Sequence, residues 1–137
     1  MKIFQIIYYL FISCRPRQWL KNLSVFAAIF FSGKLLEIES FTTVFLVFVV
    51  FCLQSSAIYL INDVIDIKAD QIHFSKKDRP IAKGRVSRQL ALITSFLLSI
   101  ISLLLSFQIS ELVFLTNLTF LVVQVFYSLS LKQVILF

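Results

Sequence analysis

Long apolar runs alternate with short polar segments along this chain. Three runs without charge, residues 40–62, 89–110 and 112–131, are each long enough for an α-helix that crosses a bilayer. Residues 19–38 form a weaker candidate, which reaches about 30 Å as a helix if the side chains of Lys21 and Lys34 extend to opposite interfaces. The pattern therefore predicts four spans, near 19–38, 41–62, 89–107 and 112–131.

The first fourteen residues need a separate interpretation. Lys2 precedes an apolar run over residues 3–14, as at the start of a secretory signal, and its end loosely resembles a lipoprotein cleavage site. Arg15, Pro16 and Arg17 follow at once, and cations there oppose translocation of the next segment. We therefore expect an interfacial helix that is retained in the mature protein. The predicted fold is all-α, a polytopic transmembrane bundle of four spans plus this helix.

Composition narrows the class of protein. Hydrophobic residues make up 59% of the chain and charged residues 15%, which excludes a water-soluble domain, including one that binds nucleic acid. Twelve of the thirteen Lys and Arg residues fall on one side of the predicted spans, and only Lys34 marks the other. By the positive-inside rule, both termini and the connection after the second span are cytoplasmic. Cys14 and Cys52 show no spacing that suggests a disulfide or a metal site.

Three carboxylates appear where the second predicted span ends: Asp63, Asp66 and Asp70. On one helix they fall within roughly a 60° arc, and Ser56 and Tyr59 continue this polar stripe into the membrane. Unpaired carboxylates repel one another, whereas Mg²⁺ relieves the repulsion and leaves positions open for substrate phosphates. The sequence therefore predicts a metal site that faces the bundle interior. In the alternative interpretation, the helix ends at Ile61 and the acids are solvated loop residues.

Five cations follow within ten residues: Lys76, Lys77, Arg79, Lys83 and Arg85. Pro80 interrupts any regular helix in this connection. A metal held by the acids, with basic side chains over the remaining phosphate oxygens, is the arrangement expected for a diphosphate substrate. In the alternative interpretation, the cations only set the topology or contact anionic lipids. His73, the only histidine, does not support a mechanism on its own.

Four motifs lie in order along the chain: Arg15-Pro16-Arg17-Gln18-Trp19-Leu20-Lys21-Asn22; Asn62-Asp63-x-x-Asp66-x-x-x-Asp70; His73-x-x-Lys76 with Arg79-Pro80-Ile81-Ala82-x-Gly84; and Tyr127-Ser128-x-x-Leu131-Lys132. With them, residues 15–132 resemble the UbiA superfamily of intramembrane prenyltransferases. The first and third motifs are similar to those of its branch that transfers phosphoribose to polyprenyl phosphates, and the fourth is similar to the family's fourth-helix motif.

The resemblance implies an all-helical enzyme of about nine helices in a bacterial inner membrane, and it argues function by analogy with a fold family. It implies that Asp63, Asp66 and Asp70 are the catalytic acids and the Mg²⁺ ligands. The implied substrate contacts are Asn62, Arg17, Lys21, Asn22, Tyr59, Lys76, Arg79, Lys83, Tyr127 and Lys132. The donor is then phosphoribosyl pyrophosphate and the acceptor a polyprenyl phosphate; the alternative is an isoprenoid diphosphate with an aromatic acceptor.

The chain departs from the family pattern in two ways. Gln71 stands where family members often have Arg after the last Asp. No acidic residue follows Glu111, so the second acidic motif of the superfamily is missing, and we expect an N-terminal fragment that is inactive alone. An oligomer or a separate chain that restores the other half is left open, and so is a non-catalytic membrane protein or degenerate remnant.

Overall fold

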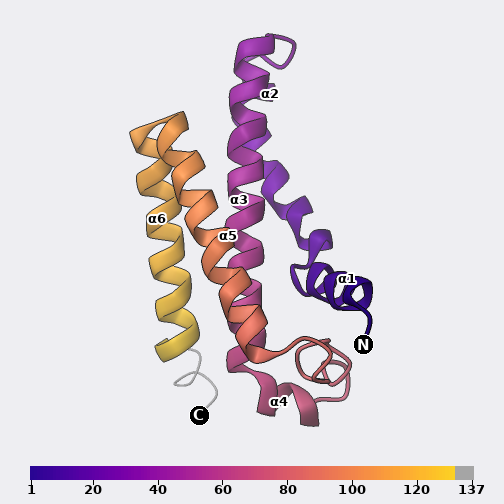
Figure 1. The fold of residues 1–137 in the computed structure, drawn as a ribbon. Coiled ribbons are helices and arrows are strands. Elements are labelled where there is room, and N and C mark those ends of the chain that lie inside the picture. Colours follow the sequence, from indigo (N-terminus) through magenta and orange to yellow (C-terminus); the bar gives the residue numbers. More distant parts are fainter. Residues whose placement is uncertain (132–137) are drawn as a thin grey trace.

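The computed structural model describes residues 1–131, and within that range the only regular elements are helices (Figure 1). In chain order they are α1 (Ile3–Ser13), η1 (Pro16–Phe26, a 3₁₀ helix), α2 (Ala27–Phe31), α3 (Ile38–Ile65), α4 (Ile67–Ile72), α5 (Arg88–Ile109), α6 (Glu111–Phe126) and η2 (Tyr127–Leu131, a π-helix). Three helices in the described range are long and apolar enough to cross a membrane: Ile38–Ile65, Arg88–Ile109 and Glu111–Ser130. The predicted all-α membrane fold is confirmed.

α3 is the central helix, with α5 packed along it and α6 packed against α5 (Figure 1). Small side chains of α5 let the two backbones approach closely. Ser95 Oγ donates to the Ala57 carbonyl at 2.7 Å, and Ser102 Oγ donates to the Val50 carbonyl at 2.9 Å. Asn117 of α6 joins the same network, because its Nδ2 donates to Ser102 Oγ at 2.8 Å. Small residues and polar contacts of this kind are the usual means of helix association in membranes.

The predicted span over 19–38 is not one regular α-helix. Its first part is η1, in which residues three apart share a face because a 3₁₀ helix has three residues per turn. Trp19 Nε1 donates to Ser56 Oγ at 2.9 Å, and Asn22 Nδ2 donates to Ser55 Oγ at 3.3 Å, so both side chains anchor η1 to α3. At their ordinary rises, η1 and α2 together extend about 30 Å beside α3. That this segment crosses the membrane stays a prediction.

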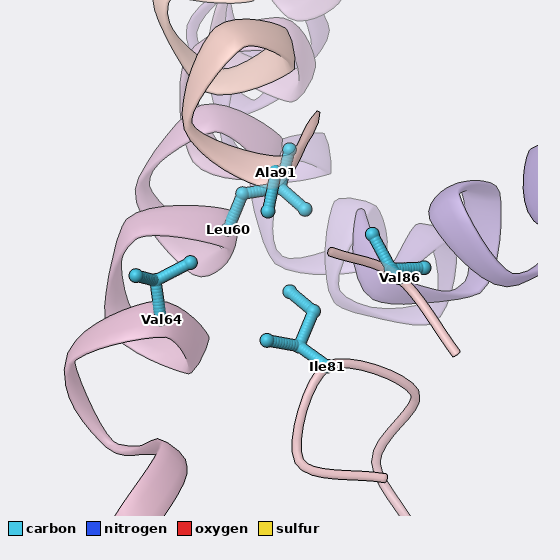
Figure 2. Packing of buried hydrophobic residues seen from close by; sticks show 5 residues of the cluster. All are labelled: Leu60, Val64, Ile81, Val86 and Ala91. Atoms are coloured by element: carbon cyan, nitrogen blue, oxygen red, sulfur yellow. The ribbon is translucent and has the colours of Figure 1, made fainter. Parts of the chain in front are cut away.

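An apolar cluster joins the connection between α4 and α5 to the helices beside it (Figure 2). It brings together α3, the connection and the start of α5 through five buried side chains: Leu60, Val64, Ile81, Val86 and Ala91. Gln71 of α4 reinforces the arrangement, since its Nε2 donates to the Ala82 carbonyl at 3.1 Å. The connection has no regular helix, as Pro80 predicts, but it has a fixed position against α3.

Candidate functional site

The predicted acidic residues lie on two helices and the junction between them. α3 continues to Ile65, so the alternative that it ends at Ile61 is wrong, but it does not extend to Asp70. Asp63 is in the last turn of α3, Asp66 is the junction residue with φ −88° and ψ 7°, and Asp70 is on α4. The expectation of one continuous helix face for all three acids is therefore corrected.

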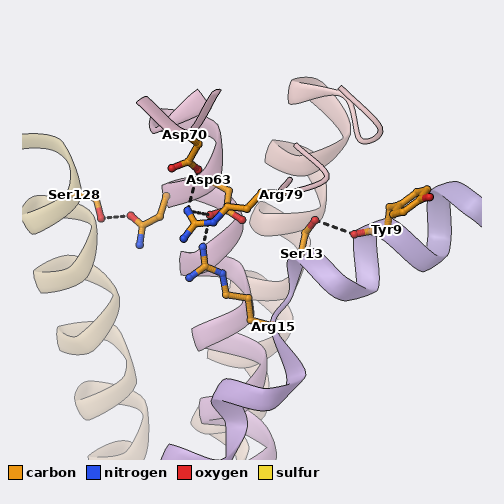
Figure 3. Close-up of polar contacts among 8 residues, drawn as sticks. Tyr9, Ser13, Arg15, Asp63, Asp70, Arg79 and Ser128 are labelled. Carbon is orange, nitrogen blue, oxygen red and sulfur yellow. Dashed lines mark hydrogen bonds and ion pairs between the residues drawn. The ribbon is translucent and has the colours of Figure 1, made fainter. Parts of the chain in front are cut away.

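Asp63 and Asp70 nevertheless converge, because Arg79 lies between them (Figure 3). The same nitrogen, Nη1 of Arg79, donates to Asp63 Oδ1 at 3.2 Å and to Asp70 Oδ2 at 2.8 Å. Both aspartates are buried at 2% exposure, so pairing with a cation compensates for the loss of hydration.

Arg15 supplies a second guanidinium to the same site. Its Nη2 donates to Asp63 Oδ1, and its guanidinium lies 4.7 Å from the centre of the Tyr59 ring, a cation–π contact. Its backbone has a φ of +53°, the left-handed conformation that turns the chain from α1 into η1. Ser56 Oγ of α3 donates to the Cys14 carbonyl at 3.1 Å, and this bond holds the peptide before Arg15 against α3. The turn after α1 thus aims Arg15 at Asp63.

The Asn62 side chain is hydrogen-bonded to η2. Its Oδ1 accepts a hydrogen bond from Ser128 Oγ of η2, and Ser128 is buried (Figure 3). The Gln124 carbonyl, 2.9 Å from Ser128 Oγ, is a second acceptor that shares the single hydroxyl hydrogen. In this structure the Asn62 amide therefore ties α3 to the end of α6.

Six other predicted substrate contacts, all within the described part of the chain, lie outside this buried group. Arg17, Lys21 and Tyr127 are exposed, Lys76 and Asn22 are half-buried, and Lys132 lies outside the described residues. Lys83 is exposed and pairs with Asp78 at 2.7 Å; its hydrogen bond lowers the pKa of the Asp78 carboxyl. The substrate roles of all these residues stay predictions.

Arg15 and Ser128, which contact the acidic motif, were absent from the predicted set. Arg15 contacts Asp63, and Ser128 contacts Asn62. Both belong to the motifs quoted above, and Arg15 begins the first of them. The signal was therefore present in the sequence, but spacing alone does not show which cation of a basic segment reaches an acid far away in the chain.

The residues of this site fit a magnesium ion in part. Within residues 1–131, no three His, Cys, Asp or Glu side chains lie close enough together to hold one ion. Two of the predicted ligands, Asp63 and Asp70, do face a single cationic nitrogen. Mg²⁺ is commonly bound by one or two carboxylates and completes its coordination with water and substrate phosphates. The pair therefore fits such an ion if Arg79 moves away.

The fold and the site define an integral membrane protein with a buried charged site at one end of its central helix. Residues 22–137 match the sequence profile of the UbiA prenyltransferase family, and the chain belongs to that family.

The chain is also similar to three proteins named decaprenyl-phosphate phosphoribosyltransferase. It is 40% identical over 123 residues to the protein of Mycolicibacterium smegmatis, an alignment that covers 87% of this chain and 39% of that protein. It is 38% identical over 123 residues to the protein of Mycobacterium tuberculosis, with 87% and 41% covered. With the protein of Corynebacterium glutamicum it shares 46% identity over 72 residues, which are 51% of this chain and 22% of that protein. The chain therefore spans well under half the length of these relatives.

Proposed function

We propose that this protein takes part in the transfer of phosphoribose from phosphoribosyl pyrophosphate to a polyprenyl phosphate, with Mg²⁺ as cofactor. The names of the mycobacterial relatives indicate the reaction class. The observation that carries the proposal is the convergence of Asp63 and Asp70 on one guanidinium nitrogen at the end of a membrane-length helix. Carboxylates with arginines beside them are suited to a metal-bound diphosphate.

The residues of this chain have separate tasks in the proposed reaction. Asp63 and Asp70 would hold the ion, with Asp66 as a further proposed ligand, and Arg79 would contact the diphosphate. Bound Mg²⁺ would neutralise charge on the diphosphate oxygens. An acceptor phosphate oxygen forms a bond to the ribose C1 as the bond from C1 to the diphosphate oxygen breaks. Arg79 would stabilise the negative charge that develops on the departing diphosphate.

The proposed location is a bacterial inner membrane with the site on the cytoplasmic side. The bias of Lys and Arg supports this orientation. The variant Phe74→Cys, made in a protein without Cys14 and Cys52, tests this orientation, because position 74 is exposed. An impermeant maleimide should label this cysteine in inverted vesicles and leave it unlabelled in intact cells. Labelling in intact cells would contradict the orientation.

Donor binding tests the function directly. The protein in lipid nanodiscs should retain labelled phosphoribosyl pyrophosphate in Mg²⁺ and lose it in EDTA. Asp63→Asn should weaken retention at least about tenfold, because it removes a charged ligand of a hard cation. Glu37→Gln, at the opposite end of α3, is the matched control and should bind normally. Retention in EDTA, equal retention by Asp63→Asn, or a preference for an isoprenoid diphosphate would contradict the proposal. Added polyprenyl phosphate then tests the remaining prediction that this chain alone does not complete the transfer.

A further inference from the structure

The charges of the buried site balance without a metal ion. Asp63 and Asp70 bring two negative charges, and Arg15 and Arg79 bring two positive charges. The Asp63 and Asp70 side chains are 3% exposed, and the two arginine side chains are about one quarter exposed. A divalent cation that entered this group alone would add two uncompensated charges where little water screens them.

The two arginines are held differently. Arg15 contacts only Asp63 of the two carboxylates, and it is fixed from behind by the Tyr59 ring and by the turn that follows α1. Arg79 bridges both carboxylates through a single nitrogen, which is the place that an ion shared by Asp63 and Asp70 would need. Arg79 is therefore the residue that a metal must displace, whereas Arg15 can remain on Asp63.

We propose that Arg79 substitutes for the metal ion and thereby makes metal binding depend on a diphosphate. The inference rests on the proposed function, because it takes Asp63 and Asp70 as the metal ligands. A diphosphate supplies the negative charge that offsets the incoming ion, and its oxygens give the displaced guanidinium a new bidentate partner. The metal and the diphosphate then bind more tightly together than either one binds alone.

Removal of Arg79 distinguishes a residue that takes the place of the metal from one that only binds the diphosphate. In Arg79→Gln the two carboxylates keep only Arg15 as a charged partner, so the site has a net negative charge and no cation between its oxygens. Metal alone should then bind more tightly than it does to the wild type. A residue that served only to bind the diphosphate would have no such effect on the metal.

Equilibrium dialysis with radioactive Mn²⁺ in the absence of any phosphate measures this effect. Arg79→Gln in nanodiscs should bind Mn²⁺ about tenfold more tightly than the wild type, because a neighbouring guanidinium no longer opposes the ion. Arg85→Gln is the matched control, since Arg85 belongs to the same connection but lies over the Tyr9 ring, 4.7 Å from its centre. It should bind Mn²⁺ like the wild type. Equal affinity of Arg79→Gln and the wild type would overturn the inference.

A second dialysis on the wild type does not depend on the folding of a variant. With radioactive Mn²⁺ and labelled pyrophosphate together, both should be retained in equal amounts, and neither should be retained alone at the same concentration. Mn²⁺ retained equally well without pyrophosphate would overturn the coupling but leave the metal site intact. Retention of neither ligand under any condition would overturn the proposed function, and the inference with it.

Discussion

The ion pair of Arg15 and Asp63 allows a quantitative test of how the N-terminal segment is joined to the bundle. Breaking a buried pair by removing one partner costs about 3–5 kcal/mol, because a buried charge loses its compensation. Here the Arg15 side chain is 26% exposed, and Arg79 remains 3.2 Å from the same carboxylate oxygen. We therefore expect Arg15→Gln to lower the free energy of unfolding by a smaller amount, about 1–3 kcal/mol.

A double-mutant cycle with Asp63→Asn isolates this pair. The free energy of unfolding is measured in mixed micelles for Arg15→Gln, Asp63→Asn and the double variant, and the coupling should be about 1–3 kcal/mol. Arg17→Gln is the matched control: Arg17 is exposed two residues further on, and its substitution should change stability by less than about 0.5 kcal/mol. Additive effects of Arg15→Gln and Asp63→Asn would refute the argument, because the two side chains would then contribute independently.

Two further substitutions test the packing and the connection. Ser95→Leu should destabilise the protein by about 1–3 kcal/mol in thermal unfolding, because the Ser95 hydroxyl bonds the Ala57 carbonyl in a closely packed interface. Ile93→Leu, at an exposed position of the same helix, should have little effect, and equal effects of the two changes would contradict the packing. Gly84→Ala should cost about 1–2 kcal/mol, because the φ of Gly84 is +76° and an added Cβ meets no other atom, so that only backbone strain acts. Gly33→Ala, at φ +74°, should cost a similar amount of stability. Only Gly84→Ala should weaken pyrophosphate binding, and equal binding by both variants would show that the turn at Gly84 does not position the site.

The length and hydropathy of the apolar runs were sufficient to predict the three membrane-length helices. The spans expected near 41–62, 89–107 and 112–131 correspond to Ile38–Ile65, Arg88–Ile109 and Glu111–Ser130. A bilayer core of fixed thickness requires a minimum length of apolar helix, so length alone is informative. The expected N-terminal helix was also found, as α1. Helix ends were less accurate, since polar residues can extend a membrane helix beyond its apolar run.

Contacts between distant residues decide the features that the sequence did not predict. η1 is a 3₁₀ helix anchored by Trp19 and Asn22 to hydroxyls of α3, and single-sequence periodicity contains no information on such partners. The break at Asp66 has the same origin, because Gln71 and the apolar cluster fix α4 against the connection that follows it. The residue types of the site were predictable, but the choice of Arg15 as the partner of an acid 48 positions away was not.

The charges at the end of α3 favour a ligand site over a structural clamp. Transfer of each ion out of water costs several kcal/mol, and a buried pair is often no more stabilising than well-packed apolar side chains. The apolar cluster in Figure 2 already holds the connection after α4 against α3 and α5. Because Asp63 and Asp70 both pair with Arg79, their oxygens already face one cationic group before an ion binds. Preorganised groups of this kind lose less free energy on binding. The contact of Arg79 with the two buried acids compensates their charge, and it is also the proposed reason why a metal binds together with an anion.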